Sequence, residues 1–316
     1  MIFAKAFSAV MTMFCIGILG YLLKRKGWIT DETARVMPKF LTTIVLPPFL
    51  MRSITATFER DQLLELISGS VVPFISIILC FILAVFVARV FGLQKGRLGI
   101  FKVSFAMSNT MNIGLPINIA LFGEMAVPYV LLYFFANVTM FWTVGNYCIA
   151  HDGNGAHVRM FSLESLKKVF SPPLLGFMTG LALVMLDIHL PVFIDKACKY
   201  VGDMAIGLGI LYIGVMLQDV RFSDYKLERD VILVLVGRFI ISPLAILVLS
   251  CFLPLPAIMR KVFVIQASLP VMMNAVILAG YYKADAKYAA VLISVSTLMA
   301  IGTVPLFTIL LEYFIS

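Results

Sequence analysis

Long apolar stretches follow one another along this chain, with only short polar connections between them. Of its 316 residues, 61% are hydrophobic and only 13% are charged, which is outside the range of soluble globular domains. A helix needs roughly 20 mainly apolar residues to cross the ~30 Å hydrocarbon core of a bilayer. We therefore predict an all-α integral membrane protein with ten transmembrane helices, at about residues 2–23, 33–54, 66–89, 98–122, 125–149, 170–187, 196–218, 230–252, 258–281 and 289–313.

Basic residues indicate the orientation of these helices. A formal net charge of +8 would suggest nucleic acid as a partner of a soluble protein, but here most Lys and Arg residues lie in short loops. They are concentrated on one side of the predicted membrane, and cytoplasmic loops characteristically carry such an excess. We therefore expect no nucleic-acid partner, a location in the inner (plasma) membrane, and both termini on the extracytoplasmic side.

The residue types that carry enzyme chemistry are not grouped in this sequence. The five cysteines occur singly, without the spacing of a zinc site or a disulfide framework. The three histidines, His151, His157 and His189, fall in predicted loops. An intramembrane enzyme needs a nucleophile and a base, or metal ligands, brought together. We therefore expect no catalytic residue, no bound metal and no cofactor.

A polar segment in the middle of the chain divides the predicted helices into two groups of five. Residues 151–169 begin with the turn-forming stretch Asp152-Gly153-Asn154-Gly155 and are predicted to form a cytoplasmic linker. Residues 1–150 then make a first five-helix repeat and residues 170–316 a second. Because five is an odd number, the second repeat enters the membrane in the opposite orientation, which is the geometry of an inverted repeat.

The fourth and ninth apolar stretches carry matching interruptions. Each contains a Leu-Pro pair with asparagine nearby, and the residues are Asn109, Asn112, Gly114 and Pro116 in the fourth and Pro270 and Asn274 in the ninth. Either proline alone would most simply be a kink, because Pro and Gly are common in membrane helices. Interruptions at corresponding places in two halves favour a binding site instead.

The chemistry of these interruptions favours an anionic ligand. Pro116 and Pro270 lack an N–H and clash with the carbonyl one turn back, so each is expected to break its helix. If a half-helix begins at each proline, its N–H groups and positive dipole end face the membrane midplane, where a carboxylate can bind. Asn112 and Asn274 add amide donors and acceptors. We predict that helices 4 and 9 cross at the breaks and form one site.

Three polar residues in other predicted helices are candidates for supporting or coupling roles. Arg238 lies ~12 Å into the eighth helix, where it either compensates substrate charge or gates the site, or else snorkels or pairs with backbone carbonyls. Asp203 is a candidate for proton or cation coupling, although its shallow depth also suits a solvated or ion-paired role. Asn137 is expected to support the broken fourth helix by hydrogen bonding.

The two interrupted segments resemble those of the auxin efflux carrier family, in its compact bacterial branch of malate or malonate permease-like transporters. The resemblance rests on residues 108–116, on residues 268–279, and on the stretches Ser294-Val295-Ser296-Thr297-Leu298 and Thr303-Val304-Pro305-Leu306. It implies that helices 1, 2, 6 and 7 form a scaffold, and that helices 3–5 and 8–10 form a transport domain that moves past it, often within a homodimer. It also implies that Pro116 and Pro270 are crossover prolines, with Asn112 and Asn274 as polar contacts.

Two functions are compatible with this pattern. The first is a secondary transporter that moves a small organic anion, a carboxylate such as malate, malonate or an auxin-like acid, by elevator-type alternating access, with H⁺ or Na⁺ as a coupling ion. The alternative is a cation- or proton-coupled exchanger on the same crossover fold, because half-helix ends also coordinate Na⁺. An exchanger is expected to carry acidic residues near the crossing, and the sequence has none there. No filter-like repeat supports a channel.

Overall fold

The computed structural model describes residues 2–57, 69–153, 158–160, 167, 169–218, 228–253 and 255–314. Within these ranges the regular structure is helical, apart from one isolated antiparallel bridge between Ser108 and Val271, so the all-α prediction is confirmed there. Of the predicted linker, residues 154–157, 161–166 and 168 lie outside the described part of the chain.

Helices cover each of the ten predicted apolar stretches within the described ranges. Five of these helical stretches are long and apolar enough to cross a membrane: Val71–Val90, Glu124–Asp152, Val192–Gln218, Arg229–Phe252 and Ala286–Leu311. Two shorter apolar helices run over Thr110–Phe122 and Pro172–Met185. The arrangement is that of an integral membrane protein, whereas ten crossings in two inverted repeats stay a prediction.

The chain divides into two compact units, and each combines segments from both halves of the sequence. The first unit contains residues 1–69, 111–132 and 170–220. Its helices are α1 (Ile2–Arg25), α2 (Asp31–Phe40), η1 (Leu41–Val45), α3 (Leu46–Thr57), α7 (Leu115–Phe122), η3 (Glu124–Ala126), α11 (Pro172–Met185), α12 (Val192–Gly202) and α13 (Met204–Gln218).

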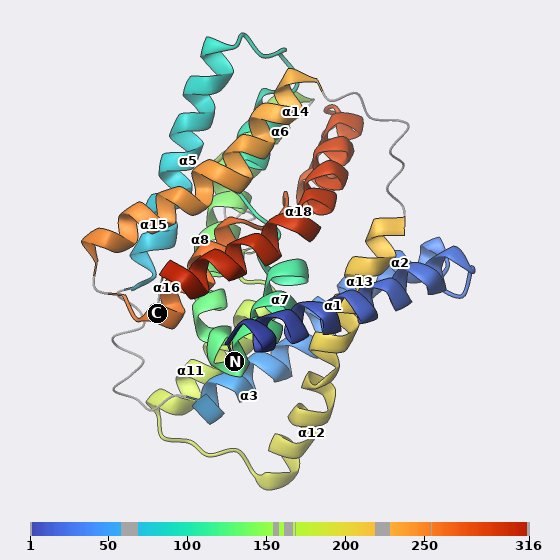
Figure 1. The fold of residues 1–316 in the computed structure, drawn as a ribbon, viewed down its shortest axis with the longest axis vertical. Coiled ribbons are helices and arrows are strands. Elements are labelled where there is room, and N and C mark those ends of the chain that lie inside the picture. The colour runs from blue at the N-terminus through green and yellow to red at the C-terminus, as the bar shows by residue number, and fades with distance from the viewer. Residues whose placement is uncertain are drawn as a thin grey trace. The chain divides into compact units, whose positions relative to one another are not determined.

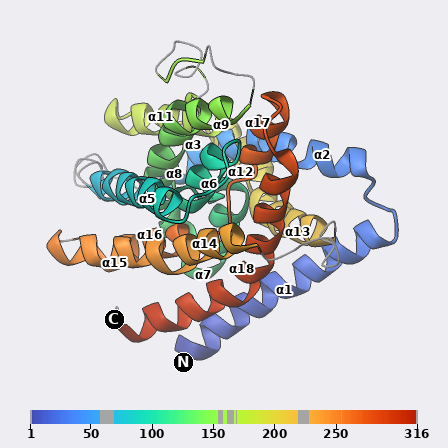
Figure 2. The ribbon, with the colours of Figure 1, turned by 90° about the horizontal axis from the view of Figure 1, so that it is seen from above.

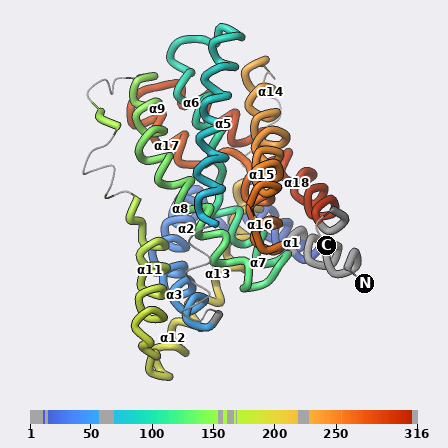
Figure 3. The backbone as a smooth tube through the Cα atoms, turned by 90° about the vertical axis from the view of Figure 1, so that its left-hand side faces the viewer, coloured from blue at the N-terminus to red at the C-terminus, as the bar shows by residue number. Residues whose placement is uncertain are grey.

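Close helix pairs hold the first unit together. Helix α1 runs beside α13 (Figure 1), and α11 runs beside α3 (Figure 3). The α1–α13 pair approaches closely because Gly20 faces the backbone of Leu211 and Gly214 faces the backbone of Gly17, with no space for a side chain at either glycine. Small residues commonly permit such close approach between membrane helices, where dispersion contacts drive association.

The second unit contains residues 70–110, 133–169 and 221–316. Its helices are α5 (Val71–Val90), α6 (Leu98–Ala106), the greater part of α8 (Val127–Met140), η4 (Phe141–Gly145), α9 (Asn146–Asp152), α14 (Arg229–Val236), η6 (Gly237–Ile241), α15 (Ser242–Phe252), α16 (Ala257–Ala267), α17 (Asn274–Tyr281) and α18 (Ala286–Phe314). Helix α5 packs against both α6 and α15, and it lies beside α15 in Figure 2. The π-helical turn η2 (Thr110–Gly114) contains the division between the units, which falls after Thr110.

A charged cluster joins the segments that precede α6, α14 and α18 in the second unit. Arg97, before α6, donates from Nε to Asp285 Oδ2 at 2.7 Å and from Nη1 to Glu228 Oε2 at 2.9 Å. Its guanidinium also lies 4.7 Å from the centroid of the Tyr288 ring. Asp285 in turn accepts from the backbone N–H of Tyr288 at 2.9 Å, so it caps the first turn of α18. The cluster joins residues that are as many as 188 positions apart.

We expect the Asp285→Asn variant to be less stable than the wild type at pH 7, by about 1 kcal/mol. Partial burial alone would raise the pKa of the Asp285 carboxyl, but the Tyr288 N–H and the Arg97 guanidinium hold it below its ordinary value of 3.8. The charged form therefore adds stability above that pH, and this contribution is lost as the pH falls below it.

Melting temperatures of the wild type and Asp285→Asn, measured from pH 7 to pH 3, check this expectation. The difference should narrow as the pH falls below about 4. Asparagine keeps one oxygen to cap Tyr288 but loses the charge and the second acceptor, which Arg97 engages, and protonation of Asp285 removes the same charge. Glu124→Gln, which removes an exposed carboxylate elsewhere, serves as the control. A constant difference across the whole pH range would contradict the assignment of the effect to the Asp285 charge.

Candidate functional site

The fourth apolar stretch is interrupted where the backbone turns from helical to extended. Helix α6 ends at Ala106, and Met107 has extended angles, φ −114° and ψ 138°. The chain becomes helical again at Thr110, first in the π-helical turn η2 and then in α7. The break therefore lies at residues 107–109, and Asn109 lies within it.

The ninth stretch is interrupted in the same way. Helix α16 ends at Ala267, and α17 begins at Asn274. Pro270 lies in the intervening segment, where its missing N–H removes no helical hydrogen bond. Asn274 is thus the first residue of the second half-helix. The N–H groups of Ala275 and Val276, which follow it, donate to the carbonyl oxygens of Met272 and Met273 at 3.1 and 3.2 Å.

The two breaks are paired by backbone hydrogen bonding. Ser108 and Val271 form an antiparallel bridge, and the N–H of Asn109 donates to the carbonyl oxygen of Pro270 at 2.9 Å. All of these residues belong to the second unit. Because each second half-helix begins directly after this pairing, the bridge fixes where the two N-terminal ends start.

Two side chains from neighbouring helices fasten the bridge in place. Asn137, on α8, accepts from the Ser108 N–H at 3.1 Å and donates to the Ser108 carbonyl at 2.9 Å. Ser296, on α18, accepts through its hydroxyl oxygen from the Val271 N–H at 3.1 Å. All four residues in these contacts are fully buried or nearly so. In each break a buried side chain thus hydrogen-bonds to the extended backbone, at Ser108 in the first break and at Val271 in the second.

Arg238 lies in the π-helical turn η6 and is fully buried. Its guanidinium donates to the carbonyl oxygens of Ala267 at 2.7 Å, Leu269 at 3.2 Å and Phe105 at 3.4 Å, and to the Ser242 hydroxyl at 3.5 Å. Phe105 and Ala267 belong to the last turns of α6 and α16. The arginine therefore caps both first half-helices at their C-terminal ends.

Gln266 and Ser296 are site residues that the sequence argument misses. Gln266 is fully buried on α16 and donates from Nε2 to the Thr110 carbonyl at 3.3 Å, at the start of the other half-helix. Its Oε1, the Asn109 Nδ2 and the Thr110 Oγ1 are buried without a hydrogen-bond partner in the structure. In the sequence, the signal for Gln266 is a lone amide side chain in the apolar run of residues 262–267, whereas Ser296 lies among other hydroxyl residues and does not stand out. Unpaired buried polar atoms at this place suit a polar ligand or water.

Asn112, Gly114 and Pro116 lie beyond the division, in or next to the first unit's helix α7. A cavity of about 10 Å³, enough for about one water molecule, is lined by Asn112 and Pro116 together with Leu41, Leu46, Met111, Leu115, Ile119, Ala205 and Gly209. The Asn112 Oδ1 is buried and has no hydrogen-bond partner. The Gly114 carbonyl accepts from the Asn118 side chain at 2.8 Å.

Pro116 does not break its helix, in contrast to the expectation from sequence. The break precedes it by a π-helical turn, and Pro116 occupies the first turn of α7. A proline in the first turn of a helix removes a donor that would lack a partner there in any case. Its ring instead fixes the spacing to α13, because a Cβ built on Gly209 would lie 2.5 Å from the Pro116 Cγ.

Asp203 lies apart from these residues, at the junction of α12 and α13. Its carboxylate accepts from Lys199 Nζ at 2.8 Å, and both side chains are about half exposed. It is not among the residues that line the Asn112 cavity. An exposed pair of this kind contributes little to stability, and this position is that of an ion-paired surface residue.

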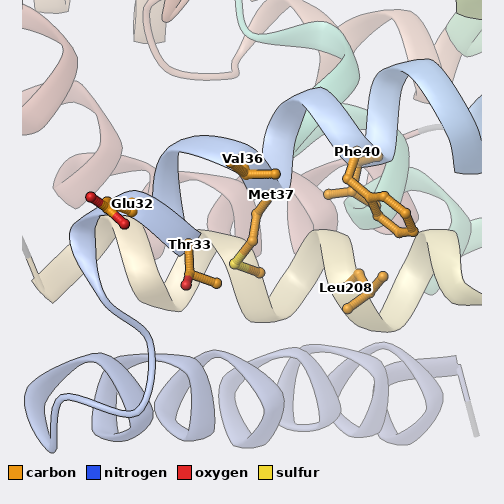
Figure 4. Close-up of a pocket in the computed structure, with 7 residues that line it drawn as sticks. Glu32, Thr33, Val36, Met37, Phe40 and Leu208 are labelled. Atoms are coloured by element: carbon orange, nitrogen blue, oxygen red, sulfur yellow. The ribbon is translucent and has the colours of Figure 1, made fainter.

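A second cavity, of about 450 Å³, lies on the first unit between α2 and α13 (Figure 4). Its lining is mainly apolar, with Val36, Met37, Phe40 and Leu208, and Glu32 lies at one end. Val36 and Phe40 are largely exposed there. The lining contains no basic group that could pair with a carboxylate, and the acidic Glu32 at its edge would repel one. The cavity therefore suits apolar chains rather than an organic anion.

Comparison with known proteins identifies a family whose model matches nearly the whole chain. A family model described as membrane transport protein matches residues 5–308. The chain belongs to this family. The family is that of the auxin efflux carriers, so the resemblance noted in the interrupted segments is confirmed. The protein is accordingly a multi-pass membrane transporter.

Three relatives of this transporter match over almost their full length. An "Uncharacterized transporter" of Methanothermobacter thermautotrophicus is 26% identical over 98% of this chain and 100% of the relative. An "Uncharacterized transporter" of Methanocaldococcus jannaschii is 24% identical over 95% of this chain and 96% of the relative. A protein of Rhizobium meliloti named "Putative malonate transporter" is 23% identical, over 95% of this chain and 94% of the relative. All three bear the names of transporters rather than enzymes.

Proposed function

We propose that this chain is a secondary transporter that moves a small organic anion, a carboxylate such as malate, malonate or an auxin-like acid. The pairing of the two breaks carries the proposal, because the second half-helices begin directly after it, at Thr110 and Asn274. The N-terminal end of a helix carries about +0.5 of an elementary charge, which favours a carboxylate. The malonate named for one relative belongs to the same chemical class.

The residues proposed to bind the anion are Asn109, Asn112, Gly114, Pro116, Pro270 and Asn274, with Asn137 and Arg238 as support. The Asn109 Nδ2 is a buried donor that has no partner in the structure and can donate to a carboxylate, whereas the unpartnered atom of Asn112 is its acceptor, Oδ1, which leaves its Nδ2 as the atom proposed to bind the anion. Asn137 fixes the bridge, and Arg238 caps the half-helices that precede the breaks. Asp203 is retained only as a candidate for coupling, because its carboxylate is engaged by Lys199.

Elevator-type alternating access is proposed as the mechanism, within an inner-membrane homodimer whose termini are extracytoplasmic. The composition of the two compact units supports it. One unit contains predicted helices 1, 2, 6 and 7, and the other contains predicted helices 3, 8, 9 and 10 with most of helix 5. Helix 4 is divided between them after Thr110. The proposed inverted repeat of residues 1–150 and 170–316 accounts for this interleaving, since each repeat contributes to each unit.

The alternative, a cation- or proton-coupled exchanger, has less support. Such a carrier needs an acidic group that can bind the ion inside the membrane. Among the described residues, the buried charged side chains are Lys24 and Arg238, and neither is acidic. A positive buried residue beside the breaks favours an anionic substrate.

Thermal shift of the purified protein with malate, malonate, succinate, pyruvate, lactate and indole-3-acetate tests the proposal. We expect selective stabilisation by one or more of these anions, with affinity reduced about tenfold in Asn112→Ala and in Asn274→Ala, since each loses one charge-assisted hydrogen bond. Gln94→Ala, which removes an exposed loop amide, serves as the control.

Unchanged affinity in both asparagine variants would overturn the site assignment. A response to Na⁺ or to pH, with none to any anion, would favour the exchanger.

A further inference from the structure

Arg238 occupies an unusual position for a buried cation. It is fully buried, and the hydrogen-bond partners that the structure describes for it are three backbone carbonyls and one hydroxyl, with no carboxylate among them. A charged side chain inside a membrane protein is costly unless something compensates it. The compensation must therefore come from the backbone.

The carbonyls that Arg238 contacts are helix ends. Phe105 lies in the last turn of α6, Ala267 ends α16, and Leu269 follows within the break. The C-terminal end of a helix carries about −0.5 of an elementary charge, so two such ends together carry about −1. One guanidinium, with a charge of +1, balances them. Its planar fork of five donors also suits several carbonyls at once.

In transporters built from broken helices, unwound carbonyls and half-helix C-terminal ends are the groups that coordinate a coupling Na⁺. In this chain the same groups are already occupied by a side chain of the protein. We propose that Arg238 is a resident cation that takes the place of a coupling Na⁺ at the crossing, so that anion binding is independent of Na⁺. This inference rests on the proposed function for its substrate, and on the contacts of Arg238 for everything else.

A resident cation also explains why the crossing keeps a preference for anions. With the two C-terminal ends neutralised by Arg238, the N-terminal ends of the second half-helices remain uncompensated. These ends together carry about +1, which matches one carboxylate. Arg238 is thus a positioning residue: it touches the half-helix ends and acts on the ligand through them.

The first measurement needs no variant. The affinity of the wild type for its stabilising anion is determined in Na⁺ buffer and again with Na⁺ replaced by N-methylglucamine. We expect the two dissociation constants to agree within about twofold. A loss of affinity of about tenfold or more without Na⁺ would overturn the proposal, because it would show a Na⁺ site that Arg238 does not replace.

The second measurement separates the charge of Arg238 from its shape. Arg238→Lys keeps a cation at this place, and Arg238→Gln keeps a hydrogen-bond donor without charge. We expect anion affinity to stay Na⁺-independent in the lysine variant and to become Na⁺-dependent in the glutamine variant. The same Na⁺ response in both variants would contradict the proposal, since a purely structural role does not distinguish them.

A third measurement tests the resident cation without any organic anion. The melting temperature of Arg238→Ala is measured with and without guanidinium at low millimolar concentration, and Arg89→Ala, which removes an exposed arginine at the end of α5, is the control. We expect guanidinium to raise the melting temperature of Arg238→Ala alone, because a small cation fits between the freed carbonyls. Equal responses in the two variants would overturn the proposal. If no anion binds the wild type, the proposed function fails. The guanidinium measurement still decides whether Arg238 is a resident cation.

Discussion

Replacing Asn137 with alanine is expected to lower the free energy of unfolding by about 1–3 kcal/mol. The side chain is fully buried and hydrogen-bonds to both the N–H and the carbonyl of Ser108. The carbonyl also accepts from the Thr110 N–H at 3.0 Å, so removal of the side chain leaves the Ser108 N–H without its partner. A buried polar group without a partner costs about 1–3 kcal/mol. Substrate affinity should fall as well, because the break at residues 107–109 is no longer fixed.

Melting temperature and anion affinity of the purified variant measure these two effects. Thr139→Val is the matched control, since the Thr139 hydroxyl, on the same helix, has no hydrogen-bond partner in the structure and valine preserves its shape. It should change stability by less than about 0.5 kcal/mol. If Asn137→Ala were as stable as the control, the bridge would not depend on the asparagine clamp.

The Gly214→Ala substitution is expected to destabilise the first unit by about 3 kcal/mol. A Cβ at this position would overlap the backbone of Gly17 on α1, and backbone cannot move aside as a flexible side chain can. The α1–α13 pair would therefore have to separate. Because these helices hold the unit together through close contact, their separation also removes dispersion contacts along both.

Gly207→Ala provides the comparison on the same helix. A Cβ on Gly207 would meet no atom within 4 Å, so alanine there should be neutral or should stabilise the helix by up to about 1 kcal/mol. The two variants share the same chemical change and differ in what the new methyl group meets. Similar melting temperatures for Gly214→Ala and Gly207→Ala would show that the α1–α13 contact is looser than described.

The helical class and the two interruptions could be predicted from the sequence because both depend on local chemistry. Apolar stretches of membrane-spanning length have few alternatives to a helix, and groups such as Asn109, Gly114 and Pro270 are conspicuous within them. Arg238 is equally conspicuous, as a charge in the middle of an apolar helix. The sequence left open whether it serves a substrate or backbone carbonyls, and the structure places it against carbonyls.

The position of the first break could not be predicted in the same way. Local rules point to Pro116, but the chain leaves the helix at Met107, where Ser108 pairs with Val271 and Asn137. That pairing involves segments far apart in the sequence, and no local preference specifies it. The same holds for Gln266, whose partner Thr110 is 156 positions away. The grouping of α7 with the first unit likewise follows from its contacts with α13 and α1 rather than from its own residues.

The bridge between Ser108 and Val271 also constrains how the chain is made. Membrane helices of the first half are synthesised before the second half exists, and domains generally fold in the order of synthesis. The N–H of Asn109 and the carbonyl of Phe105 nevertheless find their partners, Pro270 and Arg238, only after the second half has been translated. Until then the break in the first half lacks these partners, and its polar backbone groups must be hydrogen-bonded by water or by neighbouring helices. Assembly of the second unit can therefore be completed only late in biogenesis, after both halves of the chain have been synthesised.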